Sequence, residues 1–160
     1  MPLSDLRALA AVLGPSARLL GIDLGAKTIG LALSDVGRSI ASPFGAIPRR
    51  KLAANAAEIA AIARQHGVGG IVVGLPLSLD GSVGPAAQAA RDWAAALAEA
   101  TGLPTALWDE RLSTAAVSRM LVGEADLSRR RRAQVVDAAA AAWMLQGALD
   151  ALRRLPPPSS

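Results

Sequence analysis

The sequence contains no cysteine and a single histidine, His66, among its 160 residues. Neither a disulfide framework nor a thiolate or polyhistidine metal site is therefore possible, and a histidine-based catalytic triad is disfavoured. Tyrosine is absent and aromatic residues make up 2% of the chain. The core is expected to rest on Ile, Leu and Val together with Trp93, Trp108 and Trp143. Any resident metal is expected to be a hard cation bound by oxygen.

Long apolar runs are also missing. No stretch reaches the roughly 18 unbroken apolar residues of a membrane span. The N-terminal segment carries Asp5 ahead of a short apolar stretch interrupted by arginine, which makes a poor signal peptide. We therefore expect a cytoplasmic protein with no membrane partner. The net charge of +4 permits a polyanionic partner without requiring one.

The apolar pattern predicts an α/β fold. A hairpin-like β start is followed by alternating helices and strands, which favours one mixed sheet of about five strands with helices on both faces. Strand 28–34 alternates, with its larger apolar residues on one face and Gly30, Ala32 and Ser34 on the other. Strands are predicted at residues 18–24, 28–34, within 40–47, 68–75 and 104–108, and helices at 52–66, 85–100, 113–122 and about 133–152.

The chain shows no internal repeat and no interdomain linker. We expect one domain over residues 1–155, which includes an N-terminal helical extension over residues 1–16. Ser4 is the expected N-cap of that extension, and Gly14–Pro15 is its expected stop. Residues 156–160 are expected to be a disordered tail.

Two acidic positions lie on or after predicted strands. Asp23 stands inside the apolar run LLGIDLG, where a carboxylate is costly unless it is paired, hydrogen-bonded or metal-bound; the alternative is a cap on the following turn. Asp109 and Glu110 follow a later strand, and alternation allows one of the pair to face the same side as Asp23. The alternative there is a solvated strand end neutralised by Arg111.

A third acid, Asp137, lies in the last predicted helix. It begins a stripe of small or apolar residues that lets the helix approach the sheet closely, although Asp137 could also be a simple partner of the helix dipole. The stripe continues through Ala140, Ala141, Met144 and Ala148. Three acids from three elements suggest an oxygen cage for one or two Mg²⁺ or Mn²⁺ ions acting on a phosphate.

Two basic segments accompany these acids. Arg129, Arg130, Arg131 and Arg132 form an unbroken run ahead of Asp137, and Arg49, Arg50 and Lys51 form a second. Such runs are often solvated faces. Beside a metal site, the run at 129–132 would instead be placed to hold a nucleic-acid backbone without sequence choice.

Four motifs, in order, resemble the YqgF/RuvX family. That family is RNase H-like, is assigned to the processing of pre-16S ribosomal RNA, and is related to RuvC Holliday-junction resolvases. The resemblance covers the chain from about Leu19 to Leu149. The motifs are GIDLGAKTIGLALSD (Gly21–Asp35), IVVGLPLSLDGSVGPAAQA (Ile71–Ala89), DERLST (Asp109–Thr114) and VVDAAAAAWMLQ (Val135–Gln146).

The resemblance implies an RNase H-like fold and a metal-dependent nuclease active in ribosome biogenesis. Asp23, Glu110 and Asp137 become its catalytic and metal-binding acids, so that Glu110 rather than Asp109 is the second acid. The resemblance also suggests that Arg111 supports the metal ligands or binds phosphate, and Lys27 and Thr28 match the family's first-turn positions. Together with the basic run Arg129 to Arg132, these residues are the expected substrate contacts.

The sequence departs from the family pattern in two ways. Ser78 replaces the Asn that is common in the GLPLN-type loop. Ala140 and Ala141 stand where related resolvases carry a fourth acid, so the second metal ion is expected to be held weakly before substrate binds.

Other functions fit parts of this pattern. GIDLG with a nearby threonine also resembles the first phosphate loop of actin-like ATPases and sugar kinases, but those folds need a second domain for which 160 residues leave no room. A non-catalytic RNA-binding or regulatory module would need the basic segments and not the acids. A resolvase-like DNase would act as a dimer. No apolar stripe marks a dimer face, so we expect a monomer or weak homodimer and favour RNA over branched DNA.

Overall fold

The computed structural model describes residues 3–76, 84–109 and 129–154. Within them, six strands form one sheet in the order β1-β6-β5-β2-β3-β4. The elements are β1 (Leu3–Ser4), α1 (Leu6–Val12), β2 (Arg18–Leu24), β3 (Thr28–Ser34), β4 (Ala41–Pro48), α2 (Leu52–His66), β5 (Val68–Leu75), α3 (Pro85–Thr101), β6 (Thr105–Asp109) and α5 (Arg129–Arg154).

The sheet is mixed, as the sequence predicts. β2 and β3 form an antiparallel hairpin, and β4 continues it antiparallel to β3. On its other side β2 runs parallel to β5, which in turn runs parallel to β6. β2 is therefore a central strand, which agrees with the apolar character of the run around Asp23.

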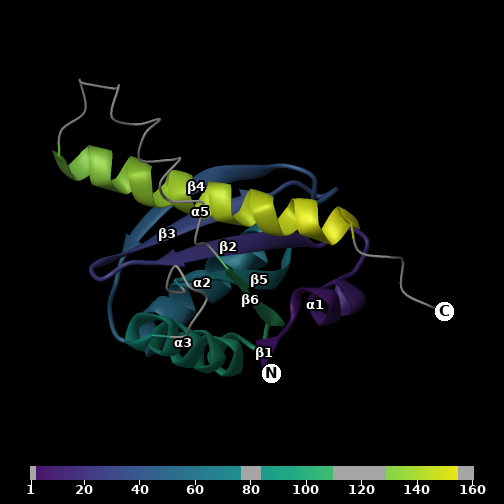
Figure 1. The fold of residues 1–160 in the computed structure, drawn as a ribbon, viewed down its shortest axis with the longest axis horizontal. Coiled ribbons are helices and arrows are strands. Elements are labelled where there is room, and N and C mark those ends of the chain that lie inside the picture. Colours follow the sequence, from purple (N-terminus) through teal and green to yellow (C-terminus); the bar gives the residue numbers. More distant parts are fainter. Residues whose placement is uncertain (1–2, 77–83, 110–128, 155–160) are drawn as a thin grey trace.

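Helices cover both faces of the sheet, which confirms the predicted layers (Figure 1). α5 crosses one face, where it packs with α1 over side chains such as Leu19 and Val72. α2 and α3 cover the other face, where Ile22 and Ile71 lie in a separate cluster. The alternation predicted for strand 28–34 is confirmed, because Ile29 and Leu31 belong to the α2 and α3 face and Ala32 to the α5 face.

Helix ends follow ordinary capping chemistry. α2 ends at Gly67, which adopts a left-handed conformation at φ 68° and donates its N–H to the carbonyl of Ala63. α3 begins with Pro85 in its first turn, as predicted, and ends at Gly102 in the same way as α2. Both helices therefore end at a glycine that can adopt the left-handed backbone conformation.

Four expectations differ from the structure. The side chain of Asp5, and not Ser4, caps α1, because Asp5 accepts the N–H of Ala8 at 2.7 Å. Ser4 instead lies in β1, a two-residue sixth strand parallel to β6 that the sequence did not predict. α5 begins at Arg129, so the arginine run lies in the helix and not in a loop before it. Trp143 is 46% exposed and is not a core residue.

Two expected elements, the helix at 113–122 and the tail at 156–160, lie outside the described residues. Among the helices that the structure describes, none is long and apolar enough to cross a membrane.

Candidate functional site

Asp23 lies near the end of β2, half-buried, on the face covered by α5. It pairs directly with Gly30 of β3, and directly paired residues of antiparallel strands project to the same face. Gly21, two residues earlier, faces α5 closely enough that an added Cβ would lie 2.8 Å from the Cβ of Leu145. Since side chains alternate along a strand, Asp23 projects from the same side as Gly21.

Asp137 lies in α5 directly over Gly30. A Cβ built on Gly30 would lie 2.2 Å from the carbonyl oxygen of Asp137 and 3.2 Å from its Cβ. The α-carbons of paired strand residues lie about 4.5–5.5 Å apart. The residue beneath Asp137 is thus the cross-strand neighbour of Asp23, and both acids lie on the same face of the sheet near the end of β2.

Thr28 joins this arrangement from the same face of β3, two residues before Gly30. Its hydroxyl donates a hydrogen bond to the Oδ2 atom of Asp137. The contact fixes one carboxylate oxygen of Asp137 relative to the sheet. Thr28 was expected to contact substrate; that role stays a prediction.

The stripe predicted on the last helix explains how α5 reaches the sheet. Its small residues allow a close approach, and glycines in the strands beneath remove the side chains that would block it. Ala140, Ala141, Met144 and Ala148 are all buried. Gly30 was not predicted to belong to the site, although an isolated glycine within a strand is a known signal of close backbone approach.

Asp109 ends β6 on the other face of the sheet. It pairs with Leu75 of β5, which packs with Ala87 and Ala90 of α3. Trp108, one residue earlier, faces α5, where the indole Nε1 atom would lie 3.2 Å from a Cβ on Gly147. Asp109 is therefore directed away from Asp23. Glu110 and Arg111 lie outside the described residues.

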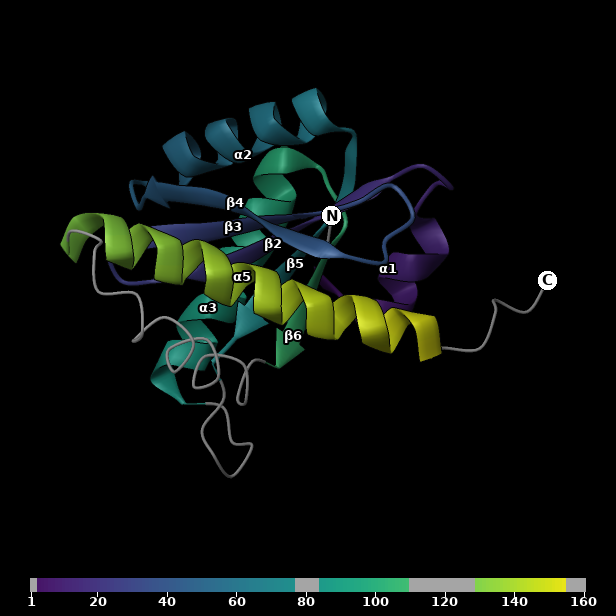
Figure 2. The same ribbon diagram turned by 90° about the horizontal axis from the view of Figure 1, so that it is seen from above.

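The exposed Lys27 and the N-terminal end of α5 lie at the same end of the sheet (Figure 1). Lys27 is exposed in the turn between β2 and β3, four residues after Asp23. The N-terminal end of α5, which begins with Arg129 to Arg132, extends over this turn in both views (Figures 1 and 2). A polyanion approaching the acids at this end would therefore meet Lys27.

The two described acids offer oxygen donors suited to a hard divalent cation. Among the residues that the structure describes, no group of three His, Cys, Asp or Glu side chains forms a complete metal site. The third expected ligand, Glu110, lies outside them. Asp23 and Asp137, on one face of the sheet, would supply two of the three carboxylates expected to bind the cation.

The comparisons with known proteins agree on the family. The family model for RuvX, described as Holliday junction resolvase, matches residues 17–151. A protein of Gluconacetobacter diazotrophicus is 62% identical over 94% of this chain and 98% of its own length. A protein of Acidiphilium cryptum is 61% identical over 95% of this chain and 96% of its own length. Both bear the name "Putative pre-16S rRNA nuclease".

A solved structure shares the fold. RuvC of Thermus thermophilus, in complex with a Holliday junction substrate, matches with a TM-score of 0.52 and 17% identity, covering 86% of this chain and 96% of that one. The predicted RNase H-like fold is confirmed by this likeness to RuvC. The family resemblance expected from the four motifs is confirmed as well, and the chain belongs to the RuvX family of nucleases.

Proposed function

We propose that the chain is a divalent-metal-dependent endonuclease that processes the 5′ end of pre-16S rRNA in the cytoplasm during ribosome biogenesis. Residues 1–155 would form one catalytic domain. The observation on which the proposal rests is that Asp23 and Asp137 lie on one face of the sheet and are both neighbours of Gly30. The names of the relatives at 62% and 61% identity support the choice of RNA.

Asp23, Glu110 and Asp137 would hold the cation. The chemistry that Mg²⁺ or Mn²⁺ supplies at such a site is activation of water and neutralisation of charge at the phosphate. Asp23 contributes its carboxylate from the sheet and Asp137 from α5. The hydroxyl of Thr28 donates to one oxygen of Asp137. A carboxylate has two oxygens with several lone pairs, so Asp137 would still be able to bind a cation.

Several cations would hold the substrate. Lys27 projects from the turn beside the acids, and Arg111 follows Glu110 in the chain. Arg129, Arg130, Arg131 and Arg132 form the first turn of α5 at the same end of the sheet. Contacts of these residues with phosphates would give affinity for RNA without sequence specificity.

Cleavage of a branched DNA junction is the second candidate. The description of the matching family model, Holliday junction resolvase, favours it. Such an enzyme would act as a dimer, because one junction presents two strands for cleavage, whereas the RNA role is compatible with a monomer or a weak homodimer.

The test compares cleavage of a 5′-extended 16S precursor RNA with cleavage of a four-way DNA junction, while light scattering gives the oligomeric state. We expect cleavage of the RNA that requires Mg²⁺ or Mn²⁺ and stops with EDTA. Asp23→Asn should abolish cleavage and leave RNA binding nearly intact, because it removes a charge from the metal site and not a phosphate contact. Cleavage by Asp23→Asn at the wild-type rate would refute the catalytic assignment; preferential cleavage of the junction would select the second candidate.

A further inference from the structure

Three consecutive cations, Arg49, Arg50 and Lys51, connect β4 to α2 and are all exposed. We call this segment the basic turn. Its backbone is attached to the β2–β3 turn, because the N–H of Arg49 donates to the carbonyl of Lys27 at 2.9 Å. The guanidinium of Arg49 also donates to the carbonyl of Gly25, at 2.9 Å. The basic turn therefore lies beside the loop that follows Asp23.

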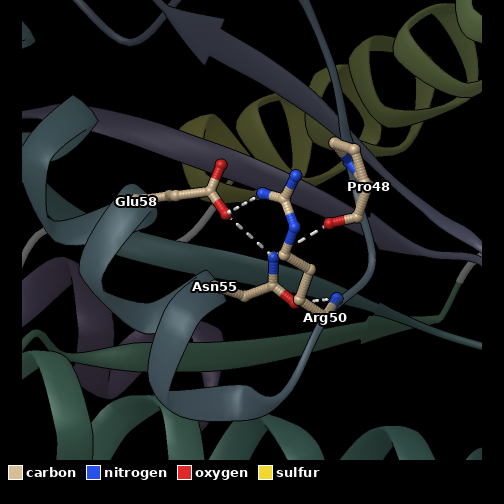
Figure 3. Close-up of polar contacts among 4 residues, drawn as sticks. All are labelled: Pro48, Arg50, Asn55 and Glu58. Atoms are coloured by element: carbon tan, nitrogen blue, oxygen red, sulfur yellow. Dashed lines mark hydrogen bonds and ion pairs between the residues drawn. The ribbon is translucent and has the colours of Figure 1, made fainter.

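A buried amide holds the basic turn in one conformation (Figure 3). Asn55 of α2 has no exposed surface; its Oδ1 atom accepts the N–H of Arg50 at 2.7 Å. Its Nδ2 atom donates to the carbonyl of Pro48 at 3.0 Å and to Glu58 at 3.3 Å. Buried polar groups that are fully hydrogen-bonded make a segment rigid. The cations are thus presented on an ordered backbone.

The charge of the basic turn is only partly balanced within the described part of the chain. Arg50 pairs with Glu58 at 3.4 Å, and both side chains are substantially exposed, at 57% and 34%. The first turn of α2 carries no acidic residue. Cations at the positive end of a helix are unfavourable for folding. Arg49 and Lys51 are therefore not explained by the stability of α2, and a polyanionic ligand would offset their cost.

We infer that Lys27, Arg49 and Lys51 form a surface that binds the phosphodiester backbone of RNA beside the cleavage site. This inference rests on the proposed function and adds to it a binding surface on the β4 side of the acids. The N-terminal end of α5 lies over the opposite face of the sheet from α2, with the β2–β3 turn between them (Figures 1 and 2). An RNA strand bound to this surface would pass around the end of the sheet near which Asp23 and Asp137 lie.

The test measures RNA binding without cleavage. Lys51→Gln and Lys27→Gln each remove one charge, and no backbone hydrogen bond of the turn depends on either side chain. Affinity for the 5′-extended 16S precursor is measured in EDTA over a range of salt concentrations. Each substitution should weaken binding several-fold near physiological salt, and each lost phosphate contact should lower the slope of log K against log salt by about 1. The double variant should lower it by about 2.

Arg64→Gln is the matched control, because Arg64 is an exposed cation in the last turn of α2, at the opposite end of that helix from the basic turn. The control should keep the wild-type salt slope. If Lys51→Gln and Lys27→Gln instead behave like Arg64→Gln, the binding surface is refuted, while wild-type cleavage of the same RNA would leave the proposed function standing. Wild-type protein that neither binds nor cleaves the RNA would refute both.

Discussion

Gly30 lies so close beneath Asp137 that no side chain fits between them: an added Cβ would lie 2.2 Å from the Asp137 carbonyl oxygen and 2.6 Å from its carbonyl carbon. Real Cβ atoms do not approach backbone atoms this closely, so any larger residue at position 30 would push α5 away from β3. Gly30 is also the cross-strand partner of Asp23. The distance of α5 from the sheet and the spacing of the two acids therefore depend on the same position.

Gly30→Ala is the first prediction. It should lower the free energy of unfolding by about 1–3 kcal/mol, the usual cost of overpacking a close contact. It should also weaken Mn²⁺ binding and cleavage strongly, because moving Asp137 changes the geometry of the proposed site. Urea unfolding measures the stability, and electron paramagnetic resonance of free Mn²⁺ measures the affinity.

Gly21→Ala separates the two effects. Gly21 lies under the same helix, where an added Cβ would meet Leu145 at 2.8 Å, two residues along β2 from Asp23. A similar loss of stability with a smaller loss of Mn²⁺ affinity is expected. Equal losses of Mn²⁺ affinity in both variants would show that either substitution displaces the whole of α5 from the sheet. The contact at Gly30 would then not affect the metal site more than the contact at Gly21.

Thr28 is the second prediction. Thr28→Val keeps the shape of the side chain but removes the hydroxyl that donates to Asp137. Loss of a hydrogen bond to a metal ligand typically costs 10–100-fold in metal affinity or activity, and we expect a loss of that size in both Mn²⁺ affinity and cleavage. RNA binding in EDTA should change little, since the hydroxyl acts on Asp137.

Thr28→Ser provides the rescue. Serine retains the hydroxyl, so it should recover most of the Mn²⁺ affinity that valine loses. If serine loses Mn²⁺ affinity while valine keeps it, the methyl group matters through packing and the positioning role of the hydroxyl is wrong. If valine weakens RNA binding in EDTA and leaves Mn²⁺ affinity intact, Thr28 contacts substrate instead.

Asp109, the last residue of β6, and Glu110, the next residue in the chain, give the third prediction. Asp109 pairs with Leu75 on the α3 face, away from Asp23. Glu110→Gln should therefore reduce cleavage and Mn²⁺ affinity far more than Asp109→Asn. Both variants are compared at equal folded fraction by circular dichroism. A larger catalytic loss in Asp109→Asn would exchange the roles of the two acids.

The central part of the fold follows from local pattern. β2, β3, β5 and α2 have the bounds expected from the sequence, because alternation, glycine and helix-stop signals coincide there. The start of α5 was misjudged, since arginine is a good helix former and a charged run need not be a loop. β1 has two residues, too few for any periodicity, and exists through its pairing with β6.

The sequence marks the two described acids as candidates but does not give their relative geometry. The chemistry of an acid in an apolar strand marks Asp23, and the alanine stripe marks the helix face that carries Asp137. The position of Asp137 over Gly30, which lies more than a hundred residues earlier in the chain, depends on how α5 packs on the sheet. No local sequence pattern encodes that packing. Asn55 was not predicted either, because a polar residue near the start of a helix gives no sign that it is buried against the turn before that helix.

Asp35 gives the fourth prediction, which concerns pH. Its Oδ1 atom accepts the N–H groups of Ile40 at 3.0 Å and Ser39 at 2.7 Å. These backbone hydrogen bonds, that from Ile40 first, hold the pKa of Asp35 below its usual value of 3.8. Because the folded-state pKa is lower than the unfolded one, the contribution of Asp35 to stability is present above the unfolded value and is lost as pH falls.

The turn that Asp35 closes also contacts the far end of α5. Gln146 donates to the carbonyl of Ser39 at 2.9 Å, and Arg153 donates to the Ser39 hydroxyl at 2.8 Å. Asp35→Asn should therefore be less stable than wild type near neutral pH, and the difference should shrink between about pH 5 and about pH 2, as the wild-type carboxylate becomes protonated. Urea unfolding of both proteins across this range measures it. A difference that stays constant with pH would mean that the charge of Asp35 contributes nothing, and that any loss comes from altered shape in the turn.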